Sequence, residues 1–241
     1  MMSGNPLFGD RLYQKVEVGV TGMTVKGTIN RLAMLLAMTL ITACWSWQQF
    51  RVDPGAGMLW AAGGAVLGLL LVLAMMFKRH LAAYLAPAYA LAEGLFLGAI
   101  SASFEQMYGG IVLQAVLLTF GVMFAMLFAY MTGIVKVTPG LMKAVFAATM
   151  GVAIYYLIAM VMGMFGAEAP LIHQSGPLGI GFSLVVIGIA AFNLVIDFAQ
   201  IENAAQAGMP KYMEWYGAFA LLVTLIWLYM EALRFLAKLR E

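Results

Sequence analysis

Seven long apolar segments limit what this chain can fold into. Bilayer hydrocarbon is about 30 Å thick, and an α-helix needs roughly 20 apolar residues to cross it. Short connections join the segments, which lie at about residues 31–47, 58–77, 81–104, 110–135, 144–165, 179–199 and 215–237. The sequence therefore predicts an all-α integral membrane protein with seven transmembrane helices.

Composition agrees with a membrane protein. Of the 241 residues, 64% are hydrophobic and 10% are charged, far from the fractions of an ordinary soluble domain. The net charge of +2 is small and dispersed, so we expect no nucleic-acid partner. The single cysteine, Cys44, lies in an apolar segment and allows neither an internal disulfide nor a cysteine metal cluster. We expect the lipid bilayer to be the main partner and no resident cofactor.

The chain divides into an arm and one membrane domain. Residues 1–30 contain basic residues and glycines but no continuous apolar core, so we expect an N-terminal cytoplasmic arm without a cleavable signal. Residues 31–241 then form a single seven-helix domain. Lys and Arg are more frequent on the N-terminal side of the membrane, which predicts a cytoplasmic N-terminus and an outer C-terminus. A re-entrant last segment would place both ends inside.

Charged residues lie in or beside the last two segments. They are Asp197, Glu202, Glu214, Glu231 and Arg234. A charge at bilayer depth costs roughly 2.5 to 3.5 kcal/mol on insertion scales, so such residues usually face a bundle interior, a partner or water. The leading interpretation is an ion or proton pathway.

The sixth segment carries a polar stripe. Asn193, Asp197 and Gln200 follow i, i+4, i+7 spacing and so share one helical face. Arg79 ends the second segment on the same side of the membrane as Asp197, and an ion pair between them would offset the desolvation of both. A static ion pair without a functional role, or a snorkelling carboxylate, is an equally weighted alternative.

The seventh segment carries a second stripe, formed by Thr224, Trp227, Glu231 and Arg234 at i, i+3, i+7 and i+10. Glu231 and Arg234 are three residues apart, which favours an intrahelical salt bridge near the outer surface.

Three further glutamates are candidates. Glu93, near the middle of the third segment, would relay protons or bind a cation, or would be a neutral structural residue bonded to a neighbouring helix. Glu202 and Glu214 are expected at the inner surface as solvated carboxylates, where they would form a rim that attracts cations. No HExxH, GxSxG or phosphate-loop pattern is present, so we expect no enzyme.

Several runs resemble a known family. They are the Glu93 to Gly98 run, Ile196-Asp197-Phe198, Glu214-Trp215-Tyr216 and the Trp227 to Glu231 run. On these residues the chain is similar to a bacterial member of the Bax inhibitor-1/YccA family, also called the transmembrane Bax inhibitor motif family. The resemblance implies that the last of the seven helices is central in the bundle. It also implies a location in the bacterial inner (plasma) membrane.

The resemblance also implies a function. Members are described as pH-sensitive calcium leak channels in which two aspartates, on the sixth and seventh helices, share a proton and an arginine after the second helix latches them. Asp197 matches the first aspartate and Arg79 the latch, whereas Thr224 stands at or near the second aspartate's position. A shared proton needs two like charges. That form of sensor does not carry over, and Glu93, Glu202 and Glu231 are the candidates to replace the second aspartate.

Two functions are therefore expected. The first is a pH-sensitive cation leak channel, for calcium, gated around Asp197. One aspartate with scattered glutamates suits weak, transient calcium coordination. The alternative is a non-channel protein that interacts with a membrane protein partner and modulates a membrane protease or stress survival.

Overall fold

The computed structural model describes residues 22–165 and 176–241, and α-helices account for most of them. The helices are α1 (Val25–Val52), α2 (Pro54–Phe77), α3 (Ala82–Met107), α4 (Ile111–Met131), α5 (Pro139–Met164), α6 (Pro177–Gln206) and α7 (Met213–Lys238), with a 3-10 turn, η3 (Arg79–Leu81), before α3. Seven helices are long and apolar enough to cross a membrane, and the described residues contain no strand. The predicted fold class is confirmed.

Side-chain caps and prolines explain where several helices begin. The Thr24 hydroxyl accepts the Gly27 N–H at 2.9 Å and starts α1, and Asp53 caps α2 in the same way. Proline occupies the first turn of α2, α5 and α6, where its missing N–H costs nothing. Because Thr24 supplies a cap, α1 begins at Val25 rather than near residue 31. Residues 1–21 of the expected arm lie outside the described residues.

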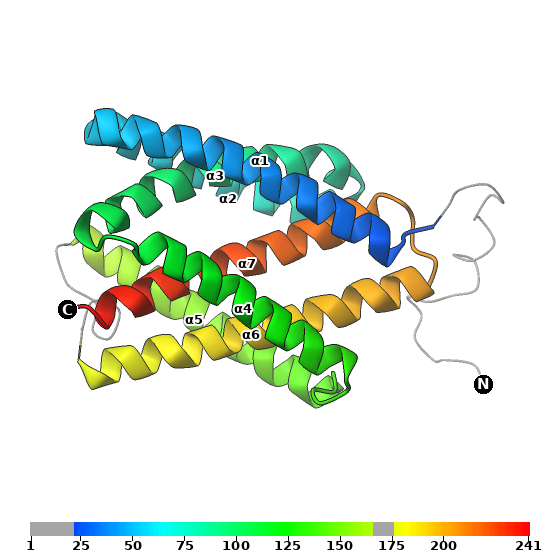
Figure 1. Ribbon diagram of the computed structural model, residues 1–241. Coiled ribbons are helices and arrows are strands. Elements are labelled where there is room, and N and C mark those ends of the chain that lie inside the picture. The colour runs from blue at the N-terminus through cyan, green and yellow to red at the C-terminus, as the bar shows by residue number, and fades with distance from the viewer. Residues whose placement is uncertain (1–21, 166–175) are drawn as a thin grey trace.

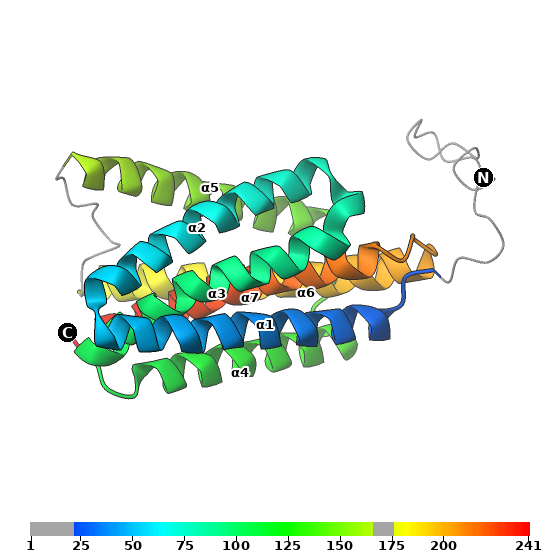
Figure 2. The same ribbon diagram turned by 90° about the horizontal axis from the view of Figure 1, so that it is seen from above.

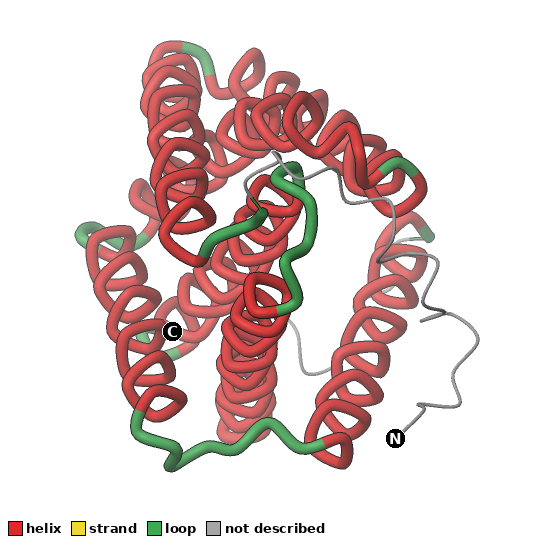
Figure 3. The backbone as a smooth tube through the Cα atoms, turned by 90° about the vertical axis from the view of Figure 1, so that its right-hand side faces the viewer, coloured by secondary structure: helices red, strands yellow, loops and turns green. Residues whose placement is uncertain are grey.

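The last helix lies inside the bundle. Figure 1 shows α7 running between α1, α2 and α3 on one side and α4, α5 and α6 on the other. It packs against α1, α3, α4 and α6, whereas α2 packs mainly on α1 and α3, and α5 mainly on α6. Figure 2 shows the same arrangement from above, and Figure 3 shows it from one end. The central position that the family resemblance implies for the last helix is therefore observed.

Glycines allow α3 to approach its two neighbours closely. A Cβ at Gly94 would overlap Thr42 of α1, and one at Gly98 would overlap the Ala43 carbonyl. On the other side of α3, a Cβ at Gly64 of α2 would stand 2.5 Å from the Ala92 carbonyl. Small residues at helix contacts permit this packing in membranes, where lipid is as apolar as the helix surface. The group α1–α2–α3 is thus a tightly packed unit on one side of α7.

Candidate functional site

Asp197 of α6 and Thr224 of α7 meet at the centre of the bundle. The Thr224 hydroxyl donates a hydrogen bond to Asp197 Oδ2 at 2.7 Å and also lies 3.2 Å from the Ala220 carbonyl of its own helix. Helical spacing assigned the two residues to separate stripes, whereas the family resemblance placed Thr224 at or near the position of the aspartate that would share a proton with Asp197. The packing of α6 on α7 turns them into one carboxylate–hydroxyl pair.

A cavity of about 360 Å³ adjoins Asp197. It lies at the end of the bundle where α1 and α7 begin, and its lining includes Arg79, Gln200 and Asn203. These three side chains are exposed, so the cavity opens at the bundle end. Gln200 therefore shares the Asp197 face as predicted. Asn193 faces elsewhere, because its amide donates to the Thr149 hydroxyl of α5 at 2.8 Å.

The predicted latch residue borders the same cavity as Asp197. Within the described residues, however, no ion pair joins Arg79 to Asp197. The Arg79 guanidinium instead lies over the ring of Tyr216, 5.4 Å from its centroid. This is the geometry of a cation–π contact. Arg79 is therefore near the carboxylate but held by an aromatic ring at the start of α7.

Three consecutive residues at the start of α7 each hold another part of the chain. Glu214 accepts hydrogen bonds from the Thr24 amide at 3.1 Å and hydroxyl at 2.9 Å, and its carboxylate pairs with Lys211 at 2.8 Å. Trp215 lies under the Arg31 guanidinium of α1, 4.6 Å away, and Tyr216 lies under Arg79. The Glu-Trp-Tyr run thus fastens α1 and η3 to the central helix.

The expectation of a solvated Glu214 is wrong. Its side chain is 1% exposed, because it caps the start of α1 and lies against Gly27, where a Cβ would overlap the carboxylate. Charged side chains are buried this completely only when they are paired or hydrogen-bonded. Thr24 supplies the hydrogen-bond donors for the buried carboxylate, and Gly27, which lacks a side chain, leaves the space that it occupies.

The other end of α7 carries a second polar cluster. Glu231, 1% exposed, accepts a hydrogen bond from the Tyr156 hydroxyl of α5 at 2.7 Å and pairs with Arg234 at 2.9 Å. The predicted salt bridge within the helix is confirmed. Lys238 donates to the Gly179 carbonyl at 3.1 Å and to a serine hydroxyl of α6. This cluster links α5, α6 and α7.

The remaining predicted acids do not line the Asp197 cavity. Glu93, on α3, is partly buried and faces Gly68 of α2, where a Cβ would lie 2.7 Å from its Oε2 atom. Glu202 accepts hydrogen bonds from the Tyr130 hydroxyl of α4 and from Gln206. Among the described residues, no group of three or more His, Cys, Asp or Glu side chains is placed to hold a metal ion.

Several residues of these clusters were missed from the sequence. Tyr156 and Ser183, the α6 serine that accepts from Lys238, gave no signal, because a lone hydroxyl in an apolar helix is common and its partner depends on helix register. Lys238 did give one, since it lies seven residues after Glu231 and so extends the α7 stripe.

Comparison with known proteins gives the family. A family model described as Bax inhibitor 1 like matches residues 5–241. No curated protein and no solved structure matches the chain. The family match extends over nearly the whole sequence, and the seven membrane-length helices with a central last helix agree with it. The chain therefore belongs to the Bax inhibitor 1-like family.

Proposed function

We propose that this protein is a pH-sensitive cation leak, with calcium as the expected ion, gated around Asp197. The observation that carries the proposal is the Asp197–Thr224 hydrogen bond beside a cavity that opens at one end of the bundle. Intramembrane carboxylates that face a bundle interior or a water-filled cavity commonly mark ion or proton pathways. We place the leak in a bacterial inner membrane with the N-terminus in the cytoplasm.

The sensor in this proposal has a single titrating group. Thr224 donates a hydrogen bond but does not ionise near neutral pH. Asp197 therefore exchanges its proton alone rather than with a second aspartate. Ionised Asp197 attracts Arg79 across the cavity and favours closure, whereas protonation removes that attraction and leaves Arg79 on the Tyr216 ring. The equilibrium between these arrangements would set the flux.

The pathway would continue along α7. Thr224 and Glu231 are seven residues apart and lie on the side of α7 that contacts α5 and α6. Their oxygen atoms and those of neighbouring hydroxyls offer hard ligands to a passing cation, although too few gather at one point for tight binding. Weak sites of this kind suit a leak, because an ion that binds tightly leaves slowly.

The test is calcium and potassium flux into liposomes that contain the purified full-length protein, at about pH 5 to 8. Wild type is compared with Asp197→Asn, which keeps the size and an oxygen acceptor for Thr224 but cannot ionise. Glu202→Gln is the matched control, because it neutralises a carboxylate of the same helix that does not line the cavity. We expect Asp197→Asn to abolish the pH dependence and Glu202→Gln to retain it.

Two outcomes would reject the proposal. An unchanged pH profile in Asp197→Asn would show that another group senses pH. Absence of flux above protein-free liposomes at every pH would favour the alternative, a non-channel protein that acts through a membrane partner such as a protease.

A further inference from the structure

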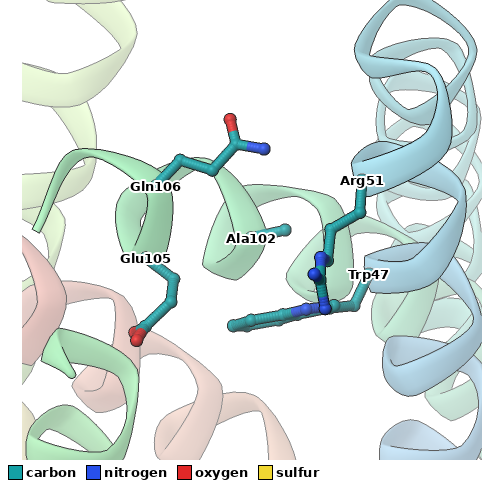
Figure 4. A pocket seen from close by; sticks show the side chains of 5 residues that line it. All are labelled: Trp47, Arg51, Ala102, Glu105 and Gln106. Atoms are coloured by element: carbon teal, nitrogen blue, oxygen red, sulfur yellow. The ribbon is translucent and has the colours of Figure 1, made fainter. Parts of the chain in front are cut away.

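A second cavity lies at the opposite end of the bundle. Its volume is about 150 Å³, and its lining is Trp47, Arg51, Ala102, Glu105 and Gln106. Figure 4 shows Trp47 and Arg51 projecting from one helix and Glu105 and Gln106 from another, with the small Ala102 between them. These are the last turns of α1 and α3. The cavity takes no part in the proposed gating at Asp197.

The guanidinium of Arg51 is unusual among the charges around it. Within the described residues no hydrogen bond or ion pair engages it. Asp53 follows two residues later, but its carboxylate accepts the N–H groups of Gly55 and Ala56 and caps α2. Asp53, the acidic residue nearest to Arg51 in the sequence, therefore already caps a helix.

Glu105, across the cavity, is committed in the same way. Its two carboxylate oxygens accept the Gly110 N–H and, at 3.1 Å, the Val112 N–H, and so hold the start of α4. These bonds fix the carboxylate in place and leave lone pairs that can accept further hydrogen bonds. The cavity therefore has a cation on one wall and an oriented anion on the other, without an ion pair between them.

Other cations at this end of the bundle have protein partners. Arg234 pairs with Glu231, Lys238 binds oxygens of α6, and Arg240 donates to the Gly109 carbonyl and to Gln114. Arg51 differs from them in facing a cavity rather than a protein acceptor. Its five N–H donors suit bidentate recognition of a phosphate.

The cavity lies at the level expected for lipid headgroups. Trp45 and Trp60, on the neighbouring turns of α1 and α2, form an edge-to-face pair with centroids 5.3 Å apart, and both are exposed. Tryptophans concentrate at membrane interfaces, where one part of the ring is apolar and the other is wet. A ligand that carries phosphate at this depth, beside apolar helix surface, is most simply a phospholipid.

We propose that this cavity binds a phospholipid headgroup that contains both a phosphate diester and a primary ammonium, as in phosphatidylethanolamine. The phosphate accepts hydrogen bonds from Arg51, and the ammonium donates to Glu105 and to the Gln106 carbonyl oxygen. The ring of Trp47 covers the apolar part of the ligand. Ala102 leaves room that a larger side chain would fill. The site holds α1 and α3 together through a lipid.

The test is native mass spectrometry of the purified full-length protein titrated with phosphatidylethanolamine, phosphatidylcholine and phosphatidylglycerol in separate arms. The variants are Arg51→Gln and Arg51→Lys. Lys136→Gln is the matched control, because it removes an exposed cation at the other end of the bundle that lines neither described cavity. A final arm adds inorganic phosphate as a competitor. Unchanged thermal unfolding of each variant shows that it is folded.

We expect phosphatidylethanolamine to bind most tightly, because the choline headgroup cannot donate hydrogen bonds and the glycerol headgroup carries no cation. Arg51→Gln should weaken this binding about tenfold, the equivalent of one hydrogen bond to a charged group. Arg51→Lys should weaken it less, and Lys136→Gln should leave it unchanged. Equal binding by Arg51→Gln and Lys136→Gln, or equal binding of the ethanolamine and choline lipids, would overturn the proposal. Displacement of the lipid by equimolar inorganic phosphate would overturn the lipid assignment.

Discussion

Replacing Glu214 by alanine should destabilise the protein strongly although the residue lies at the edge of the bundle. The substitution leaves the Thr24 amide and hydroxyl without the acceptor that they contact at 3.1 and 2.9 Å. Hydrogen bonds to charged groups contribute about 1.5 to 3 kcal/mol each. The Lys211 side chain is 45% exposed, so its ion pair adds at most about 1 kcal/mol. Because these contributions are not additive, we expect a net loss of about 3 kcal/mol.

The assay measures thermal unfolding of the detergent-solubilised protein. Samples are heated to a series of temperatures, and size-exclusion chromatography measures how much folded protein remains. A loss of about 3 kcal/mol corresponds to a decrease in Tm of roughly 6 to 12 °C for a chain of this length. Lys211→Ala is the matched control, because it removes only the exposed ion pair and should lower Tm by no more than about 4 °C. Glu214→Gln should fall between the two, since its amide keeps one acceptor for the Thr24 hydroxyl.

Comparing Glu214→Ala with Lys211→Ala separates the capping of α1 from the surface ion pair. If Glu214→Ala and Lys211→Ala unfold within about 2 °C of each other, the capping of α1 by α7 contributes nothing beyond a surface ion pair. The Glu-Trp-Tyr run would then not hold α1 against the central helix.

Three further substitutions test other contacts by the same thermal assay. Gly98→Val should prevent α3 from packing on α1, because its Cβ would overlap the Ala43 carbonyl, and little protein should elute in the folded peak; normal recovery would contradict this close contact. Tyr156→Phe should cost about 1.5 to 3 kcal/mol, since it removes one hydrogen bond to the charged Glu231 but leaves the Arg234 pair; a Tm equal to that of the wild type would contradict this contribution. Lys238→Met should cost about 1 to 3 kcal/mol, because two oxygen acceptors of α6 lose their donor; an unchanged Tm would show that water replaces the ammonium.

The sequence predicted the fold better than it predicted the site. Membrane thickness fixes the length of an apolar helix, so all seven helices were identifiable without knowledge of their packing. The Glu231–Arg234 pair was likewise predictable, because it depends only on the geometry of one helix. The first helix begins earlier than expected, because glycines disfavour a helix in this part of the chain but Thr24 supplies an N-cap.

Contacts between helices explain what could not be predicted. The meeting of Asp197 with Thr224 depends on the register of α6 against α7, which periodicity within each helix does not determine, so only the family resemblance pointed to it. Burial of Glu214 depends on Thr24, 190 positions away in the sequence. Arg79 was correctly associated with the Asp197 side of the membrane. Its contact with Tyr216 depends on how η3 lies relative to the start of α7, which the sequence does not determine.

The central position of α7 has a consequence for biosynthesis. This helix is translated after α1 to α6, so those six helices enter the membrane before the element on which four of them pack exists. Until then the Thr24 amide, the Asp197 carboxylate and the Tyr156 hydroxyl lack their α7 partners. The six earlier helices are therefore held mainly by their own hydrophobicity and by contacts within α1–α2–α3 and within α4–α5–α6, with few contacts between these two groups. A ribosome that stops before Met213 would release an open assembly with exposed polar groups, the type of substrate that membrane quality-control proteases remove.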